Sequence, residues 1–303
     1  MVQKIKYPQK KERNMNWVSI ERDKCKECGL CLSICLRCFS KKDGKTEVFA
    51  NEENCNLCGH CVAICPTKAV VHHRMNMEAF SDLKGRDPIT KDAFVKFLQR
   101  RRSHRNFLEK EIPREVMADL FDTCRLAPTG SNVQNVGIMV LQDRQKIEKL
   151  IDLTVDYYRK VIPLVEKKVG RLKKEGKPIP PDLRWAWERT KMYPFMFKNR
   201  ESGGDPIFRG AHTILIFHSI PYTSTPKDNC VIAAHTLALT AMTMGLQTCF
   251  IGLFETAFKN HSPVAKELNL PAGHQVFSVL VLGYPRHKFL RTVERKPLKV
   301  KWV

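Results

Sequence analysis

The sequence predicts an α+β protein of two parts, a small cysteine-rich unit followed by a larger domain in which helices pack on a mixed sheet. Three observations carry this prediction. Two near-identical cysteine runs lie within the first 66 residues, apolar residues at helical spacing begin near residue 92, and short β-rich apolar runs follow them. The length of 303 residues is about right for two domains.

The larger domain shows both helical and strand patterns. Residues 92–100 and 114–126 place apolar side chains at helical spacing. The run from Cys230 to Met244 predicts a long, largely apolar helix, which is too short to span a membrane and should be internal. Three short runs predict buried strands: Val136–Leu141, Thr213–Phe217 and Val276–Leu282.

The segment boundaries follow from composition. Met75 to Thr90, with two turn-forming residues and several charges, is typical of a connector. Met15 is a second candidate start, which would make the first fourteen residues an extension. We therefore expect a basic N-terminal extension at 1–16, a cysteine-rich unit at 17–74, a linker at 75–90, and a second domain at 91–303 with an insertion at 155–205.

The cysteine runs predict two iron–sulfur clusters. Their patterns are Cys25-x2-Cys28-x2-Cys31-x3-Cys35 and Cys55-x2-Cys58-x2-Cys61-x3-Cys65, with Pro66 after the second. The x2-x2 loops let three thiolates close on one [4Fe–4S] cube, while the fourth reaches the other cube. We therefore assign Cys25, Cys28, Cys31 and Cys65 to one cluster, and Cys55, Cys58, Cys61 and Cys35 to the second.

Zinc and disulfides are the alternatives for these cysteines. Zinc ribbons also use C-x2-C pairs, but a zinc ion needs only four ligands, and the repeated third cysteine and the x3-Cys ending are not part of that pattern. Disulfides are disfavoured because the chain shows no apolar signal segment and thiols stay reduced in the cytosol. The repeat resembles the bacterial two-[4Fe–4S] ferredoxin from residue 17 to about 73, with Leu36 where that family usually has proline. Cys38 remains unassigned.

The net charge of +21 is spread along the chain. No nucleic-acid motif accompanies it, so we disfavour nucleic acid as a partner. Some arginines instead suit a phosphate-bearing cofactor, and the rest suit an acidic redox partner such as ferredoxin or flavodoxin. No stretch approaches the ~18 apolar residues of a membrane span, so we expect a cytoplasmic protein that does not enter the membrane. The basic regions are Lys4–Arg13, Gln99–Arg105, Lys160–Lys177 and Arg286–Lys301.

The second domain carries five motifs in a characteristic order. They are the run Arg101-Arg102-Ser103-x-Arg105, the loop from Ala127 to Asn135, the turn from Asp205 to Ala211, the segment from Gly245 to Gly252, and Leu282-Gly283-Tyr284-Pro285 with a late Arg295-Lys296-Pro297-Leu298. In this order they resemble the FMN-dependent nitroreductase family, and specifically its members with an N-terminal two-cluster ferredoxin. The resemblance covers residues 17–303.

The resemblance implies which residues hold FMN. Arg101, Ser103 and Arg295 match positions that hold the phosphate, for which bidentate guanidinium groups are well suited. Arg102 and Arg105 match positions that reach the ribityl chain or the pyrimidine edge. The loop residues Pro128, Thr129, Gly130, Ser131, Asn132 and Gln134 match the loop under the isoalloxazine, and Cys249, Phe250, Ile251 and Gly252 match a wall near N5. Taken alone, the arginine run would be a solvated helix end and the loop a plain turn.

Residues 155–205 match none of these motifs. We expect a basic helix, a break at Lys177–Pro181, and then an aromatic-rich segment that forms a lid over the flavin. The alternative is an arm that packs on a second subunit. The resemblance implies an intertwined homodimer with FMN at the subunit interface. The aromatic residues of the segment are Trp185, Trp187, Tyr193, Phe195 and Phe197.

These observations indicate an FMN oxidoreductase with a built-in relay. Electrons would pass from an external donor, such as reduced ferredoxin, through two [4Fe–4S] clusters to FMN, and then to a small flat electrophile: a nitroaromatic, a quinone or an activated alkene. We assign no catalytic side chain, because the flavin carries the chemistry. Two alternatives stay open: NAD(P)H oxidation with electrons leaving through the clusters, and a redox or iron sensor that binds nucleic acid.

Overall fold

The computed structural model describes residues 16–83, 85 and 88–303. They form two compact units: unit 1 ends at Pro88 and also takes in Ser131–Val133, and unit 2 begins at Ile89 and holds the rest. The basic extension expected at 1–16 lies outside the described residues except for Asn16, and so does the alternative start at Met15. Among the described residues, no helix is long and apolar enough to cross a membrane.

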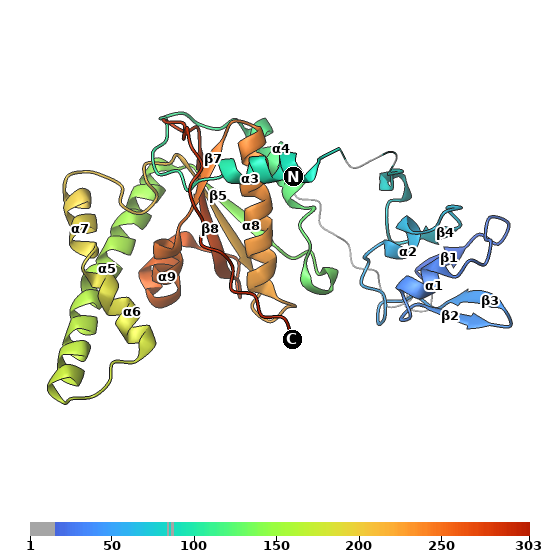
Figure 1. The fold of residues 1–303 in the computed structure, drawn as a ribbon, viewed down its shortest axis with the longest axis horizontal. Helices are drawn as coiled ribbons and strands as arrows, with labels where there is room; N and C mark the ends of the chain where they lie inside the picture. The colour runs from blue at the N-terminus through green and yellow to red at the C-terminus, as the bar shows by residue number, and fades with distance from the viewer. Residues whose placement is uncertain (1–15, 84, 86–87) are drawn as a thin grey trace. The chain divides into compact units, whose positions relative to one another are not determined.

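Unit 1 is a small repeat of two similar halves (Figure 1). Its strands pair as two antiparallel ribbons, β1 with β4 and β2 with β3. A compact apolar core holds the two short helices against these ribbons, and the cysteines themselves form part of that core. The elements are β1 (Val18–Ile20), α1 (Leu30–Ile34), β2 (Phe39–Lys42), β3 (Lys45–Val48), α2 (His60–Ala63), β4 (Val70–His72) and the 3₁₀ turn η2 (Met77–Ala79).

Unit 2 is built on a four-stranded sheet in the order β5-β6-β8-β7. The strands are β5 (Gly137–Leu141), β6 (Thr213–Ser219), β7 (Gln247–Phe250) and β8 (Gln275–Gly283). Three of them confirm the strands predicted from the sequence to within two residues. β7 was not predicted as a strand, because four residues of mixed polarity give no clear period.

All neighbouring strands in this sheet are antiparallel, which corrects the expected mixed sheet for the described residues. The connection from β6 through α8 (Pro226–Thr243) to β7 brings the chain back in the same direction, but β6 and β7 are not neighbours. β8 lies between them and runs opposite to both. The α+β class is confirmed, and the parallel pair is not formed.

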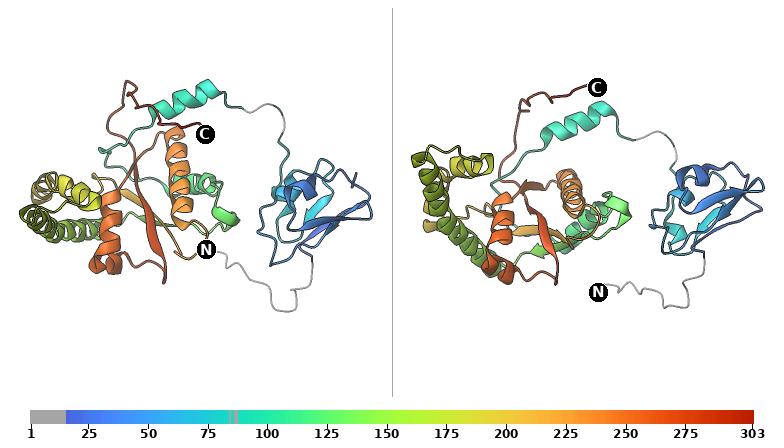
Figure 2. Two further views of the ribbon diagram at one scale, coloured as in Figure 1. Left: turned by 60° about the horizontal axis from the view of Figure 1, so that its bottom comes forward. Right: turned by 90° about the horizontal axis from the view of Figure 1, so that it is seen from below.

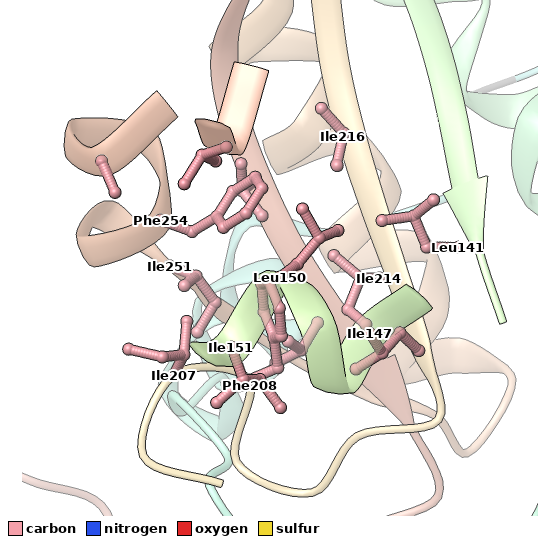
Figure 3. Close-up of a cluster of buried hydrophobic side chains, with 14 of the residues drawn as sticks. Leu141, Ile147, Leu150, Ile151, Ile207, Phe208, Ile214, Ile216, Ile251 and Phe254 are labelled. Atoms are coloured by element: carbon pink, nitrogen blue, oxygen red, sulfur yellow. The ribbon is translucent and has the colours of Figure 1, made fainter. Parts of the chain in front are cut away.

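Helices cover both faces of the sheet (Figures 1 and 2). Along β6, Ile214 and Ile216 belong to the core under α5, α9 and α10, whereas Leu215 and Phe217 belong to the core under α4 and α8. Because side chains alternate between the faces of a strand, a run of apolar residues buries both faces at once. Figure 3 shows the first of these cores.

The helices of unit 2 begin where the sequence supplies caps. Thr90 caps the first helix, since its hydroxyl accepts a hydrogen bond from the Ala93 N–H at 3.2 Å. The expected helices at 92–100 and 114–126 are confirmed, and the expected apolar helix begins earlier, at Pro226, where proline is tolerated. The helices and turns on this part of the chain are α3 (Lys91–Arg100), α4 (Arg114–Cys124), the 3₁₀ turn η3 (Gly130–Asn132), α9 (Gly252–Asn260) and α10 (Ser262–Leu268).

The expected insertion consists of three helices: α5 (Arg144–Lys174), α6 (Pro181–Thr190) and α7 (Tyr193–Glu201). The break predicted at Lys177–Pro181 separates α5 from α6. α5 itself begins eleven residues before position 155, and its first three turns are buried in the core through Leu150 and Ile151. Both α6 and α7 pack on α5, and α7 lies beside its first half, where Arg200 bonds Glu148 and Asp152 (Figure 1).

Candidate functional site

The two cysteine loops of unit 1 share one backbone conformation. Glu27 and Leu57, one residue before Cys28 and Cys58, have positive φ angles of 49° and 55°. The glycines one residue after those cysteines, Gly29 and Gly59, have φ angles of 73° and 71°. Alternating left-handed residues turn successive backbone N–H groups toward one side, which is the arrangement found around iron–sulfur sulfurs.

Cys25, Cys31 and Cys65 lie within electrostatic range of one another. The pKa of Cys31 is raised, first by burial and further by the nearby charges of Cys65 and Cys25. The Cys65 sulfur also accepts a hydrogen bond from the Ala69 N–H at 3.2 Å. The fourth member of this predicted set, Cys28, is exposed. The last cysteine of the second run thus lies with the first run.

The second set has the reciprocal arrangement. The pKa of Cys61 is raised to about 12, mainly by burial and in part by the neighbouring charges of Cys35, Cys55 and Cys58. Cys35, which ends the first run, therefore lies with three cysteines of the second. Cys38, unassigned from the sequence, is buried beside them, and its sulfur contacts the Asn54 carbonyl at 3.5 Å.

Among the described residues, no three Cys, His, Asp or Glu side chains converge on a single metal-ion position. Zinc requires four ligands around one ion at about 2.0–2.3 Å. A cubic cluster is held by four thiolates at four different corners, so its ligands stand apart. The grouping of the thiols and the left-handed loops around them are compatible with the second requirement.

In unit 2, the arginine segment lies along the β7 edge of the sheet. The His104 N–H donates to the Thr248 carbonyl at 3.0 Å, and the Leu108 N–H donates to the Tyr284 carbonyl at 2.9 Å. Gly283 permits this approach, because a Cβ there would come within 2.8 Å of the Phe107 ring. Residues far apart in the sequence are therefore held side by side.

A cavity of about 240 Å³ opens next to this segment. Ser103 and Arg105 line it together with His287 and Lys288, so the cavity is basic. Sequence reasoning did not single out His287 and Lys288; the basic run directly after Tyr284-Pro285 was the available signal. Arg101 is half-buried and Arg295 is exposed in the C-terminal segment, and neither is among the residues that line this cavity.

Arg102 and His104 each have one buried nitrogen atom without a hydrogen-bond partner among the described residues. The Arg102 Nη1 donates to the carbonyls of Gln99 and Arg101, both at 2.7 Å, and its Nη2 donates to the Arg291 carbonyl at 3.2 Å. Its Nε and the His104 Nδ1 are buried and have no hydrogen-bond partner among the described residues. The pKa of His104 is lowered, mainly by burial, which favours the neutral ring. Buried polar atoms without partners are rare, and a bound ligand, an ordered water or an ion can each satisfy them.

The polar loop after α4 lies apart from the arginine segment; its residues up to Gly130 and from Gln134 onward belong to unit 2. The Gly130 N–H donates to the Asn229 Oδ1 at 2.8 Å, and the Gln134 N–H donates to the Thr129 hydroxyl at 3.1 Å. Gly130 is required here, since a Cβ would meet the Thr225 hydroxyl at 2.3 Å. Gln134 itself has a φ of 44°. Left-handed non-glycine residues store strain and concentrate at functional loops.

The arginine segment and the polar loop lie at diagonally opposite corners of the sheet. The loop leads into Gly137, which pairs with His218 near the end of β6 on the β5 edge. The arginine segment borders Thr248 on the β7 edge. Thr248 pairs with Leu282 of β8, and Leu282 pairs with Thr213 of β6. The arginine segment therefore lies at the end of the sheet where β6 begins. With strands about 4.8 Å apart and about 3.3 Å per residue, the corners are separated by roughly 20 Å. One chain does not bring these two groups together.

The segment Cys249–Gly252 forms the turn from β7 into α9. Cys249 is buried and Phe250 is exposed. The Ile251 N–H donates to the Val279 carbonyl at 2.9 Å, so it is not available to a ligand. The N–H groups of the first turn of α9, which begins at Gly252, have no side-chain cap and remain candidate donors.

The turn from Asp205 to Ala211 supplies a further arginine. The Asp205 carboxylate accepts hydrogen bonds from the N–H groups of Phe208 and Gly210, at 2.7 and 2.9 Å. This holds Arg209 in a left-handed conformation with a φ of 64°, and its Nε is buried without a partner among the described residues. Arg209 and Arg105 line the same cavity, of about 510 Å³.

The predicted lid packs on its own chain. Arg200 of α7 bonds Glu148 and Asp152 of α5, at 2.7 Å each, and Arg159 bonds Glu201 at 2.9 Å. Of the aromatic residues, Trp185, Tyr193 and Phe195 line cavities, whereas Trp187 lies under Lys173 and Phe197 under Arg159.

Together these features indicate an oxidoreductase that carries an iron–sulfur unit. Comparison with known families agrees. A model of the nitroreductase family matches residues 98–284, which is more than half of the chain, so the protein belongs to that family. A model of the 4Fe-4S binding domain matches residues 48–71, which contain the second cysteine run.

Individual relatives are distant. A 4-nitrobenzoate reductase of Nocardioides sp. (strain LMS-CY) is 26% identical over 220 residues, which span 64% of this chain and 81% of that protein. A nitroreductase with bound FMN from Bacteroides fragilis has a TM-score of 0.50 at 20% identity, covering 69% of this chain and 97% of that one. A BluB-like flavoprotein from Clostridium difficile has a TM-score of 0.51 at 16% identity, covering 67% and 94%. These two structures establish the fold of unit 2.

Proposed function

We propose that the protein is a reductase that takes single electrons from an external donor through two [4Fe–4S] clusters and delivers them, by way of FMN, to a small flat electrophile. The observation that carries the proposal is the combination, in one chain, of two groups of thiols, three of one predicted set and all four of the other, with a basic cavity at the arginine segment. When bound, FMN supplies the exchange between one-electron and two-electron transfer.

For the FMN site we propose the residues expected from the sequence. Arg101, Ser103 and Arg295 would hold the phosphate, and Arg102 and Arg105 would contact the ribityl chain or the pyrimidine edge. The unpartnered Arg102 Nε and His104 Nδ1 support a polar ligand here. Lys288 adds positive charge to the same cavity, which His287 also lines. Charge-assisted bonds of this kind are about twice as strong as neutral ones.

The remaining predicted contacts, Pro128 to Gln134, would come from a second copy of the chain. The support is the separation of the two corners of the sheet, roughly 20 Å, which leaves the loop of one chain far from the arginine segment of the same chain. A homodimer with two-fold symmetry places the loop of each copy against the arginine segment of the other. Each of the two sites would then need both copies.

For the clusters we propose the crossed ligand sets, Cys25, Cys28, Cys31 and Cys65 in one and Cys55, Cys58, Cys61 and Cys35 in the other. The electrostatic grouping of these thiols supports the crossing. The thiolates hold the irons, and the left-handed loops aim N–H groups at the sulfurs, which raises the reduction potential.

The proposed donor is an acidic protein such as a ferredoxin or flavodoxin. Its attraction would come mainly from unit 2, because residues 17–74 carry nine basic and seven acidic side chains, a small part of the net +21. Charge complementarity accelerates transient docking and weakens with salt. Turnover with such a donor should therefore fall as ionic strength rises.

The proposed substrate classes are nitroaromatics, quinones and activated alkenes. The relative named as a 4-nitrobenzoate reductase favours the first. Reduction of a nitro group to a nitroso group takes two electrons and two protons and releases one water. The protons would come from solvent, since no side chain is assigned as the acid.

An anaerobic panel tests the proposal. Purified protein would be offered a nitroaromatic, a quinone and an enoate, with either reduced ferredoxin or NAD(P)H as donor. We expect reduction of at least one substrate with reduced ferredoxin, and slower or no reduction with NAD(P)H. NAD(P)H-driven reduction of an external one-electron acceptor would instead support the alternative in which electrons from NAD(P)H leave the protein through the clusters. No turnover, together with a salt-dependent shift of DNA, would support the sensor hypothesis.

A further inference from the structure

Two cavities adjoin at the start of α9. The first, about 470 Å³, lies between α5, α6 and α9, and the second is the 510 Å³ cavity that Arg105 and Arg209 line. Arg189, Tyr193 and Leu253 line both. Volumes of this size are typical of small-molecule sites. The first cavity borders Gly252, the residue proposed to face the flavin.

The first cavity is aromatic with one charge. Four of its lining residues have large aromatic side chains, Tyr157, Tyr158, Tyr193 and Trp185. Arg189 is the charged side chain among the lining residues, and no carboxylate lines the cavity. Aromatic walls with a few placed polar groups favour a flat ring whose orientation is fixed by its substituent.

The charge of Arg189 is not neutralised. Its guanidinium lies 3.8 Å from the centroid of the Trp185 ring, on the same helix. Within the described part of the chain it forms no ion pair, whereas Arg159 and Arg200 of the same insertion are both paired with carboxylates. A guanidinium that is stacked on a ring keeps its fork of donors free for a carboxylate.

The tyrosines act as neutral donors. Burial raises the pKa of Tyr193 and Tyr158, so both phenols keep their protons. The Tyr158 hydroxyl is already used, since it donates to the Leu253 carbonyl at 3.0 Å. Tyr193 stacks beside Tyr158 with ring centroids 4.8 Å apart, and its hydroxyl forms no hydrogen bond to any described residue.

We propose that this cavity binds an aromatic ring that carries a carboxylate, and that Arg189 selects the carboxylate. The ring would lie among Tyr157, Trp185 and Tyr193, and the carboxylate would turn toward the second cavity, where Arg105 and Arg209 add positive potential. The proposal rests on the proposed function, because it names the substrate class of the same site. Arg189 is then a specificity-determining residue that touches substrate.

Binding of an unreactive ligand tests Arg189 without turnover. The Kd of benzoate and of benzamide would be measured by calorimetry on the FMN-loaded, full-length protein. We expect benzoate to bind at least about ten-fold tighter than benzamide, as one charge-assisted bond provides. Arg189→Gln should abolish this preference, and Arg189→Lys should retain part of it. Arg184→Gln, an exposed change on the same helix, is the matched control and should leave it intact.

Turnover separates the two proposals. With chemically reduced protein, Arg189→Gln should raise the KM for 4-nitrobenzoate about ten-fold and leave the KM for its methyl ester unchanged. If the wild type prefers benzoate through Arg189 but reduces neither nitro compound, the carboxylate site stands and the reductase proposal fails. If it reduces both equally and Arg189→Gln changes neither KM nor Kd, the role of Arg189 is overturned. Unchanged FMN content and circular dichroism would show that the variant is folded.

Discussion

The His104 N–H donates a hydrogen bond to the Thr248 carbonyl at 3.0 Å, which holds the arginine segment against the strand that leads into α9. One backbone bond thus connects the proposed phosphate end of the FMN site to its proposed N5 end. The neighbouring bond from Leu108 to Tyr284 extends the contact into the C-terminal segment. The site therefore depends on how closely these segments approach, as well as on the side chains they carry.

Gly283→Ala should weaken FMN binding several-fold although Gly283 is not a proposed ligand. The added Cβ would lie 2.8 Å from the Phe107 ring, so the arginine segment must move away from β8. Overpacking of this kind typically costs about 1–3 kcal/mol. FMN titration and thermal unfolding would measure the effect. Phe107→Leu should partly restore FMN binding, and Gly170→Ala, at a helical site with open space, is the control. An unchanged FMN affinity in Gly283→Ala would contradict the close approach.

Arg101→Ala and Arg295→Ala should each weaken FMN binding by roughly ten- to a hundred-fold, from ~1.5–3 kcal/mol per charge-assisted bond at ~1.4 kcal/mol per decade. Riboflavin has no phosphate and should bind the wild type and both variants almost equally. Arg100→Ala, an exposed neighbour at the end of α3, is the control for charge alone. Equal losses for FMN and riboflavin would exclude the phosphate role.

Mixed dimers test whether each FMN site uses two copies. One chain would carry Arg101→Ala with Arg295→Ala, and the other would carry Thr129→Ala with Gln134→Ala, with different tags for purification. A shared site predicts that this mixed dimer regains one intact FMN site, built from the unaltered half of each chain. The control dimer, all four changes in one chain and none in the other, should contain no intact site. FMN retained by the control dimer but not by the first would place the site within a single chain.

The sequence predicted the elements whose signal is local. Apolar spacing located α3 and α4 almost to the residue, and runs of β-branched residues located β5, β6 and β8. The cysteine spacing indicated the crossing of Cys35 and Cys65, because an x2-x2 loop physically closes three thiols together. Each of these features is determined by residues that are close together in the chain, so its pattern can be recognised in a single sequence.

Features that depend on distant segments were not predicted. The antiparallel order of the sheet follows from β8 entering between β6 and β7, and no local pattern encodes that insertion. The same holds for His287 and Lys288, which join the arginine segment through the pairing of Phe107 with Pro285 and the bonds of Arg286 to Asn106. In the sequence, Arg189 is one of many basic residues of the insertion, and nothing local distinguishes it. The packing of α6 on α5 brings it into an aromatic cavity.

Iron content tests the crossed cluster assignment. Protein purified without air should hold about eight irons per chain, four for each cluster. Cys35→Ala combined with Cys58→Ala removes two ligands of one proposed cluster, so about four irons should remain. Cys35→Ala combined with Cys28→Ala removes one ligand from each proposed cluster, so few irons should remain. Iron analysis and electron paramagnetic resonance would measure this. If the pattern is reversed, with about four irons kept by the Cys28 pair and few by the Cys58 pair, Cys35 does not cross.

Cys28→Ala should separate the proposed relay from the reduction of substrate. The change removes a proposed ligand of one cluster and no proposed FMN contact, so the flavin should stay bound at wild-type stoichiometry. Turnover driven by reduced ferredoxin should fall at least about ten-fold, because the route for single electrons is interrupted. Turnover driven by dithionite should be kept, since that reductant reaches the flavin directly. Cys124→Ala, at a buried thiol between α4 and α8, is the matched control and should leave both rates unchanged. If Cys28→Ala loses both rates to the same degree with FMN still bound, the clusters support the flavin unit in some other way and the relay is rejected.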